Sequence, residues 1–254
     1  MRSKLTKTQA DIKHNNIVQT IGPRPLRFYG DGISYLEEGE EAEIKGRLIV
    51  IEGPDASGRS TQIGGLITHL EASGHAVLNT GLKRSDLIAP GLLEAKRNFA
   101  IGKKTLSLFY AADFADQLEN KIIPALRAGY IVLADRYIFT LMARDLVRGI
   151  SRTWSHNLFG FAIIPDLVYY LDVNPAMLVH RVFEKNSSLD YYESGADMGL
   201  SEDMLESFLK YQAMLGKEFR RMQKKYGLVS IDGNRSPEEI HSDLRTRIDK
   251  FLLR

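Results

Sequence analysis

The hydrophobic positions fall into five short apolar runs that alternate with longer stretches of helical periodicity. The runs predict strands over 47–53, 76–80, 130–135, 166–172 and 228–232. The longer stretches predict helices near 59–73, 104–128, 139–149, 175–185, 201–225 and 236–253. The strands hold few polar residues, which is typical of a sheet that helices cover on both faces. We therefore expect an α/β fold with a parallel five-stranded sheet.

The first 45 residues differ in character from the rest of the chain. Apolar positions at 17–21 and 26–35 suggest two short strands, the second turning at residues 30–32, and the acidic run 37–43 has the pattern of a solvated linker. A segment of this length makes a poor independent core. We expect residues 1–45 to form an N-terminal extension and residues 46–254 to form the domain that carries the chemistry.

A glycine-bounded loop follows the strand over 47–53 and opens the next predicted helix. From Gly53 to Thr61 it reads G-P-D-A-S-G-R-S-T, which matches the phosphate-binding pattern G-x-x-x-x-G-K-[ST] except that Arg59 replaces the lysine. In such a loop the backbone N–H groups surround phosphate oxygens, the cation reaches the terminal phosphates, and a hydroxyl, here Ser60, binds Mg²⁺. An ordinary glycine turn is the alternative. The residues expected to bind the nucleotide are Gly53, Ala56, Ser57, Gly58, Arg59, Ser60 and Thr61.

Composition narrows the class of protein. The chain has 254 residues, of which 44% are hydrophobic and 26% charged, and its net charge is +2. So small a positive excess gives no reason to expect a nucleic-acid partner. The chain has no cysteine, which excludes thiolate chemistry and suits a reducing compartment. No run approaches 18 apolar residues and Met1 to His14 lack an apolar core, so we expect a cytoplasmic protein without a membrane anchor.

In a sheet of this kind ligands bind beyond the carboxyl ends of the strands. Asp135 ends the strand over 130–135 and Arg136 follows it. The carboxylate could hold Mg²⁺ there, and the guanidinium could bind a phosphate of the acceptor. A structural salt bridge is the alternative. Asp55 lies inside the phosphate loop, where an acid could position the group that receives the phosphoryl, or could simply form an Asx turn.

Other positions carry weaker signals. Lys83 and Arg84 follow the second strand and could face the same crevice or solvent. Asp172 and Asn174 are expected to start and cap the helix over 175–185. That helix presents Arg181 and Lys185 four residues apart, ahead of a polar stretch over 186–189, so both cations could close over phosphates as part of a lid, or be ordinary surface charges.

Aromatic residues in the helix over 104–128 are a further weak signal. Phe109, Tyr110 and Phe114 form a stripe that usually belongs to a core, although one ring could stack on a base.

The chain from Gly46 onward resembles the thymidylate kinases, which are P-loop NTPase-like nucleoside monophosphate kinases. The stretches that carry the resemblance are 51–61, 108–113, 123–129, 134–137 and 170–175. It implies transfer of the ATP γ-phosphoryl group to dTMP with Mg²⁺, and a homodimer formed through helices of the core. It also implies that Asp55 lies near the acceptor, that Ser60 binds Mg²⁺, that Arg136 binds the acceptor phosphate, and that Tyr110 stacks on the base.

The sequence departs from the family mainly where the acceptor binds. Phe114 stands where the family has the arginine that reads the pyrimidine, while Leu141 and Arg144 replace a polar residue and a tyrosine. Ala56 replaces the arginine that follows the loop acid in the family. The lid motif, which resembles D-R-x-E in the family, reads D-Y-Y-E over 190–193, so neither usual position of the catalytic arginine holds an arginine. The family's T-R-E-P-G stretch is likewise replaced over 80–84.

These departures predict a nucleotide kinase whose acceptor specificity has shifted or relaxed. They also suggest that Arg59 combines the role of the lysine with that of the missing arginine, which makes Asp55, Arg59 and Arg136 the candidate catalytic residues. Two alternatives remain open. One is a polyphosphate-dependent nucleotide kinase, and the other is a nucleotide-binding protein with little or no catalysis.

Overall fold

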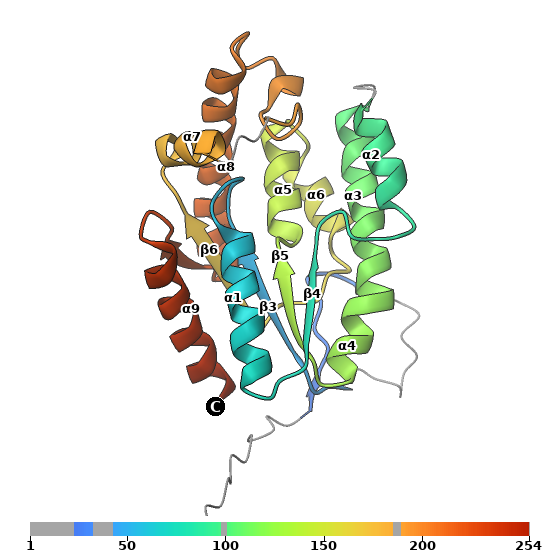
Figure 1. Ribbon diagram of the computed structural model, residues 1–254. Coiled ribbons are helices and arrows are strands. Elements are labelled where there is room, and N and C mark those ends of the chain that lie inside the picture. Colours follow the sequence, from blue (N-terminus) through green and yellow to red (C-terminus); the bar gives the residue numbers. More distant parts are fainter. Residues whose placement is uncertain (1–22, 33–42, 98–100, 185–188, 254) are drawn as a thin grey trace, which may run out of the picture.

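A computed structural model of the chain describes residues 23–32, 43–97, 101–184 and 189–253. Its centre is a five-stranded parallel sheet with the order β4-β5-β3-β6-β7 (Figure 1). The strands are β3 (Arg47–Glu52), β4 (Val77–Gly81), β5 (Ile131–Asp135), β6 (Leu167–Asp172) and β7 (Val229–Asp232). Each of the five predicted strands is confirmed to within one residue at either end.

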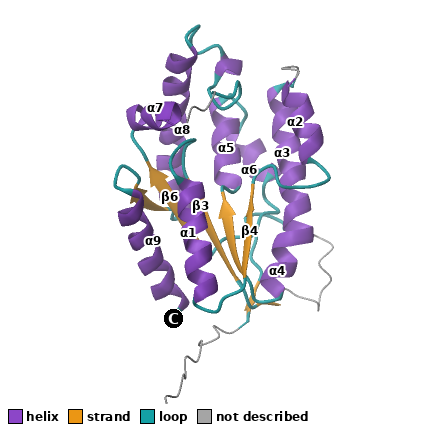
Figure 2. Ribbon diagram, in the orientation of Figure 1, coloured by secondary structure: helices purple, strands orange, loops and turns teal. Residues whose placement is uncertain are grey.

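The helices lie in two layers, one on each face of the sheet (Figure 2). They are α1 (Arg59–Ala72), α2 (Ala89–Arg97), α3 (Lys103–Gln117), α4 (Ile123–Arg127), α5 (Ile138–Val147), α6 (Arg152–Leu158), α7 (Pro175–Glu184), α8 (Met204–Tyr226) and α9 (Pro237–Leu252). Because successive strand side chains point to opposite faces, Ile49 and Ile51 pack with α1 and α9, while Leu48 and Val50 pack with α3, α5 and α8. The predicted α/β architecture is therefore confirmed.

The helix predicted over 104–128 is a continuous helical stretch with a wider turn in it. Leu118–Ile122 forms a π-helical turn, η1, between α3 and α4. Pro124 lies in the first turn of α4, and proline has no N–H to donate and clashes with the carbonyl four residues earlier. The π turn accommodates that proline without ending the helix.

Two helices were not predicted, and both are short. Helix α2 begins Ala89-Pro90-Gly91. Pro90 and Gly91 together mark a loop in a sequence, even though proline is well tolerated in the first turn of a helix. Helix α6 has only seven residues and begins after Ser151, whose side chain accepts the N–H of Trp154. A short 3₁₀ turn, Ala196–Met198, was also not predicted.

The N-terminal extension differs from the prediction. The strand expected over 26–35 is wrong where it is described, since the paired residues are β1 (Arg24–Pro25) and β2 (Glu43–Ile44), and Glu43 therefore does not belong to a linker. The N–H groups of Tyr29 and Gly30 bond instead to carbonyls of Ala162 and Gly160, at 3.0 and 2.7 Å. The segment is therefore held both by its own antiparallel β1–β2 pair and by bonds to the main domain. The strand expected over 17–21 lies outside the described residues.

Among the helices that the structure describes, none combines the length and apolar character that a membrane crossing requires.

Candidate active site

The phosphate loop joins the carboxyl end of β3 to the start of α1. Gly58 precedes the helix with φ +93°, a conformation that favours glycine, and no side chain caps the helix. The N–H groups of the first turn of α1 therefore keep their donor capacity at the positive end of the helix dipole. A side chain at Gly53 would place its Cβ 2.8 Å from Ser57 Oγ, so the loop closes tightly only with glycine there. This backbone fits a bound phosphate group.

The side chain of Arg59 folds back over its own loop. Its Nε donates to Asp135 Oδ1 at 2.7 Å, and its Nη1 donates to the carbonyl of Gly53 at 2.6 Å, to the carbonyl of Pro54, and to Ser57 Oγ at 3.1 Å. Burial and the charge of Arg136 lower the pKa of Arg59, and Asp135 partly offsets them. The cation predicted to bind phosphates is thus held inside the loop, and its contact with phosphates stays a prediction.

Ser60 and Asp135 supply two oxygens at the mouth of the loop. The hydroxyl of Ser60 lies 3.4 Å from Asp135 Oδ2, because β3 and β5 are neighbours and Ile51 is paired with Asp135. Oxygen ligands of this kind suit Mg²⁺. The described ranges contain no cluster of three or more His, Asp or Glu that could hold a metal ion.

Asp55 forms an ion pair with Arg136 across the crevice. Arg136 directly follows β5 in the left-handed region at φ +70°, and its N–H donates to the carbonyl of Ile51 at 3.0 Å. Burial by itself would raise the pKa of Asp55, but the charges of Arg136, Arg144 and Arg59 outweigh it and hold this pKa well below its usual range. Asp55 is therefore ionised and paired with Arg136, and its role toward the acceptor stays a prediction.

Arg144 of α5 reaches the same carboxylate. Its Nη2 lies 3.6 Å from Asp55 Oδ2 and 3.6 Å from Glu193 Oε1, and its Nη1 donates to the hydroxyl of Tyr110 at 3.3 Å. Its guanidinium carbon lies 5.9 Å from the centre of the Tyr110 ring. The structure thus brings together four of the residues predicted from separate motifs, namely Asp55, Tyr110, Arg136 and Arg144.

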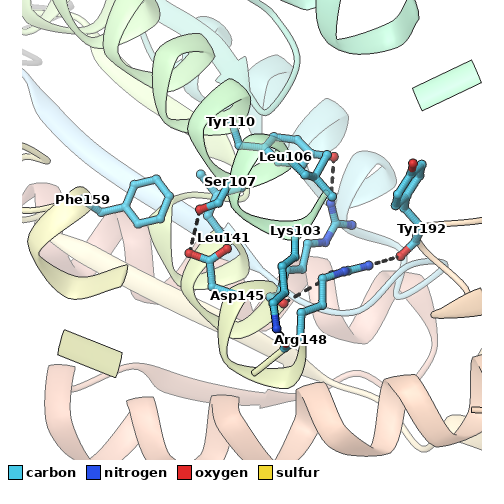
Figure 3. A pocket seen from close by; sticks show the side chains of 10 residues that line it. Lys103, Leu106, Ser107, Tyr110, Leu141, Asp145, Arg148, Phe159 and Tyr192 are labelled. Atoms are coloured by element: carbon cyan, nitrogen blue, oxygen red, sulfur yellow. Dashed lines mark hydrogen bonds between the residues drawn. The ribbon is translucent and has the colours of Figure 1, made fainter. Parts of the chain in front are cut away.

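A small cavity of about 10 Å³ lies between α3 and α5 beside these residues (Figure 3). Its walls include Tyr110, Leu141 and Arg144, three of the residues predicted to bind the acceptor, and that role stays a prediction. Its volume suffices for about one water molecule, so a base would require side chains to move. Phe114 does not line this cavity and instead packs edge-on against Tyr137, with ring centres 4.8 Å apart.

The remaining lining residues of this cavity are Lys103, Leu106, Ser107, Asp145, Arg148, Phe159 and Tyr192. Asp145 accepts hydrogen bonds from Ser107 Oγ at 2.8 Å and from Ser155 Oγ at 2.7 Å. This buried polar cluster was not predicted, since Asp145 and its two partners come from three separate helices and no local pattern joins them.

The D-Y-Y-E segment over 190–193 is attached to the site by lysines. Lys96 Nζ lies 3.1 Å from Asp190 Oδ2, and Lys83 Nζ lies 3.4 Å from Glu193 Oε1. Lys83 therefore faces the crevice, as one reading of the sequence suggested, whereas Arg84 bonds to the exposed Asn79. Sequence reasoning missed Lys96, Asp190 and Glu193 as contributors to the site.

The helix α7 approaches the phosphate loop from the other side. Arg181 Nη1 donates to the carbonyl of Ser57 at 3.2 Å and Nη2 to that of Gly233 at 2.9 Å. Asn174 Oδ1 accepts the N–H of Ala176 at 3.0 Å, which is the capping contact expected from the sequence. Lys185 and most of the predicted lid stretch lie outside the described residues.

Comparison with known proteins agrees with this geometry. The thymidylate kinase family model matches residues 51–244, from β3 into α9. The probable thymidylate kinase 2 of Saccharolobus solfataricus is 32% identical over 210 residues, which cover 82% of this chain and 98% of that protein. The thymidylate kinase of Shouchella clausii is 30% identical over 217 residues, which cover 82% and 97%. With the phosphate loop, Asp135 and Arg136 all inside the matched region, the chain belongs to the thymidylate kinase family of nucleoside monophosphate kinases.

Proposed function

We propose that this protein transfers the γ-phosphoryl group of ATP to a nucleoside monophosphate, with Mg²⁺ as the cofactor. The observation that carries the proposal is the placement of two pairs on opposite sides of one loop. Ser60 and Asp135 lie 3.4 Å apart on the donor side, and Asp55 is paired with Arg136 on the acceptor side. Both sets of groups needed for in-line transfer are thus within reach of one phosphate chain.

On the donor side the chain positions and neutralises the nucleotide. The amides from Gly53 to Thr61 hold phosphate oxygens, and Arg59 turns from its own carbonyls toward the β and γ oxygens. Arg181 binds the donor in this proposal, which its hydrogen bond to the carbonyl of Ser57 supports, with Lys185 as the second cation expected from that helix. Ser60 and Asp135 would hold Mg²⁺, which when bound neutralises charge on the β and γ phosphates.

On the acceptor side Arg136 binds the phosphate of the monophosphate, and Asp55 orients the attacking oxygen. Tyr110 offers a ring for the base. Leu141 and Phe114 offer no hydrogen bonds to the edge of a pyrimidine, so discrimination for thymine is weaker than in a site that reads this edge. The acceptor is therefore a nucleoside monophosphate chosen with a shifted or relaxed preference relative to dTMP.

The test is a steady-state assay with Mg·ATP and a panel of nucleoside and deoxynucleoside monophosphates. Transfer to several acceptors, or to one other than dTMP, supports the proposal. Efficient turnover restricted to dTMP contradicts the shift in specificity while leaving the kinase activity intact. Replacing ATP with polyphosphate as the donor separates this enzyme from a polyphosphate-dependent nucleotide kinase.

A second candidate function is nucleotide binding with little catalysis. It is favoured by one observation, the retention of Arg59 by Gly53, Pro54, Ser57 and Asp135. Measuring the affinity for ATP beside product formation distinguishes the two functions, because a binding protein retains ATP without turning it over.

We also propose, from the family, a cytoplasmic homodimer that binds small nucleotides and requires neither nucleic acid nor membrane.

A further inference from the structure

The acceptor side holds more cationic groups than a single phosphate-binding arginine. Asp55 is shared by Arg136 and Arg144, and Glu193 is shared by Arg144 and Lys83. Three cations thus face two carboxylates, so this cluster carries a net charge of +1. All three cations come from elements that meet at the carboxyl end of the sheet. An excess positive charge in a crevice attracts an anion.

The two guanidinium groups are buried and incompletely satisfied. The side chains of Arg136 and Arg144 are 9% and 8% exposed. The Nε of each is buried and has no hydrogen-bond partner among the described residues. A buried donor without a partner is costly, and such groups in a crevice are explained by a ligand that satisfies them.

Arg144 also makes no hydrogen bond to either of its two carboxylate partners. Both of its ion pairs are 3.6 Å long, beyond hydrogen-bond distance, and its one hydrogen bond goes to the neutral hydroxyl of Tyr110. Arg148, four residues later at the end of α5, differs from Arg144 in its hydrogen bonds. Arg148 bonds to both oxygens of Asp197, to the Tyr211 hydroxyl and to the carbonyl of Tyr192, at 2.7 to 3.0 Å. Arg148 is therefore a structural arginine, while Arg144 retains donor capacity.

We propose that Arg144 and Arg136 form a two-arginine clamp for the phosphate of the acceptor, with Asp55 as the internal anion that separates the two guanidinium groups until phosphate arrives. The identity of this phosphate as an acceptor rests on the proposed function. A phosphate dianion supplies the third negative charge needed to balance the three cations and the oxygen acceptors that the cluster lacks, and guanidinium groups bind it in a forked geometry. Arg144 thereby serves the acceptor where the family places a neutral tyrosine.

The clamp requires opposite effects from two substitutions. Removing the charge of Arg144 should weaken phosphate binding, whereas removing the charge of Asp55, which competes for the same arginines, should tighten it. A purely structural role for either residue does not produce a gain in affinity. The combination of signs is therefore the diagnostic result.

The experiment is calorimetric titration of the full chain with inorganic phosphate, with and without saturating Mg·ADP, which separates phosphate at the clamp from phosphate at the loop. We expect Arg144→Gln to raise the Kd for phosphate at least about tenfold and Asp55→Asn to lower it at least about threefold. The matched control Arg152→Gln, which removes a half-exposed arginine paired with Glu218 outside this cluster, should change this Kd by less than about twofold. If Arg144→Gln does not fold, Arg144→Lys, which keeps the charge and loses the fork, should raise the Kd at least about threefold.

The proposal is overturned if the wild-type protein binds no phosphate beside Mg·ADP, if neither Arg144 variant weakens binding, or if Asp55→Asn fails to tighten it. Its failure is distinguishable from failure of the kinase proposal. A protein that shows these changes in Kd but transfers nothing from ATP retains the clamp and loses the activity. A protein that transfers phosphoryl groups with unchanged Kd values retains the activity and loses the clamp.

Discussion

The Nε of Arg59 lies 2.7 Å from Oδ1 of Asp135, so the cation of the phosphate loop is joined directly to the carboxylate proposed to hold Mg²⁺. The two residues are 76 positions apart and meet because β3 and β5 are neighbours in the sheet. If Asp135 holds Mg²⁺ as proposed, the metal would compete with the guanidinium of Arg59 for this carboxylate. Binding of Mg·ATP would release Arg59 from Asp135 and make it available to the phosphates.

This relationship predicts different results for two substitutions of Arg59. Arg59→Ala should lower kcat at least about 100-fold, because it removes a cation that neutralises charge in the transition state. Arg59→Lys loses the simultaneous contacts with Asp135 and the loop carbonyls, so kcat should fall. Because the lysine keeps the positive charge, we expect this fall to be less than about tenfold. Steady-state kinetics with melting temperatures measured in parallel separate catalysis from stability. Unchanged turnover in both variants would contradict the role assigned to Arg59.

Ser60→Ala removes the hydroxyl that faces Asp135. We expect kcat to fall and the Mg²⁺ concentration for half-maximal rate to rise by about tenfold, since one oxygen ligand is lost. Activity measured across a magnesium titration gives both quantities. Thr68→Ala is a matched control, because Thr68 is exposed on the same helix and bonds only to the carbonyl of Gly64. Equal magnesium requirements in the two variants would show that Ser60 does not bind the metal.

The parts of this structure that follow from local patterns were predictable from the sequence. The five apolar strands and the phosphate loop have short, regular signatures, and the neighbouring strand ends place Asp135 beside Ser60. The contacts of Lys96 with Asp190 and of Lys83 with Glu193 span 94 and 110 residues. Nothing in the local sequence specifies such pairs, because they depend on how α2 and the 190–193 segment pack in three dimensions.

The acceptor pocket illustrates the same limit. Counting along the family motifs placed Phe114 where an arginine reads the pyrimidine, yet its ring packs against Tyr137 and is 3% exposed. The motif fixed the position along the helix but not the direction of the side chain. Arg144, in contrast, was identified only as a departure, and its packing brings it to Asp55.

Restoring the family residue with Phe114→Arg should therefore fail to restore a preference for dTMP. A guanidinium at this buried site is desolvated and loses the aromatic contact with Tyr137, so we expect a loss of about 3 kcal/mol or more in the free energy of unfolding. Urea denaturation measures this loss, and Phe114→Leu provides the apolar control with a smaller decrease. A stable Phe114→Arg variant with a lowered KM for dTMP would show that the side chain reaches the acceptor.

Glu52, the last residue of β3, is a fully buried carboxylate that supports the acceptor side. Its Oε1 accepts the N–H groups of Tyr137 and Thr140 at 2.9 and 3.1 Å, and its Oε2 accepts the Thr140 hydroxyl at 2.5 Å. Burial raises the pKa of Glu52 above its ordinary value, and these hydrogen bonds and Arg136 only partly offset it. Ionisation of Glu52 at neutral pH therefore lowers the free energy of unfolding.

Glu52→Gln should for this reason stabilise the protein at neutral pH. Glutamine keeps an acceptor for both N–H groups, and its amide can donate to the rotated Thr140 hydroxyl. Because the folded state binds the proton of Glu52 more tightly than the unfolded chain, wild-type stability falls as pH rises from the ordinary value of 4.5 through the raised pKa. The variant lacks this fall, so its advantage should be absent below pH 4.5 and should grow as pH rises toward 7. Urea denaturation of both proteins at pH 4 and pH 7 measures the free energy of unfolding of each. The prediction is contradicted if the stability of the variant minus that of wild type is smaller at pH 7 than at pH 4.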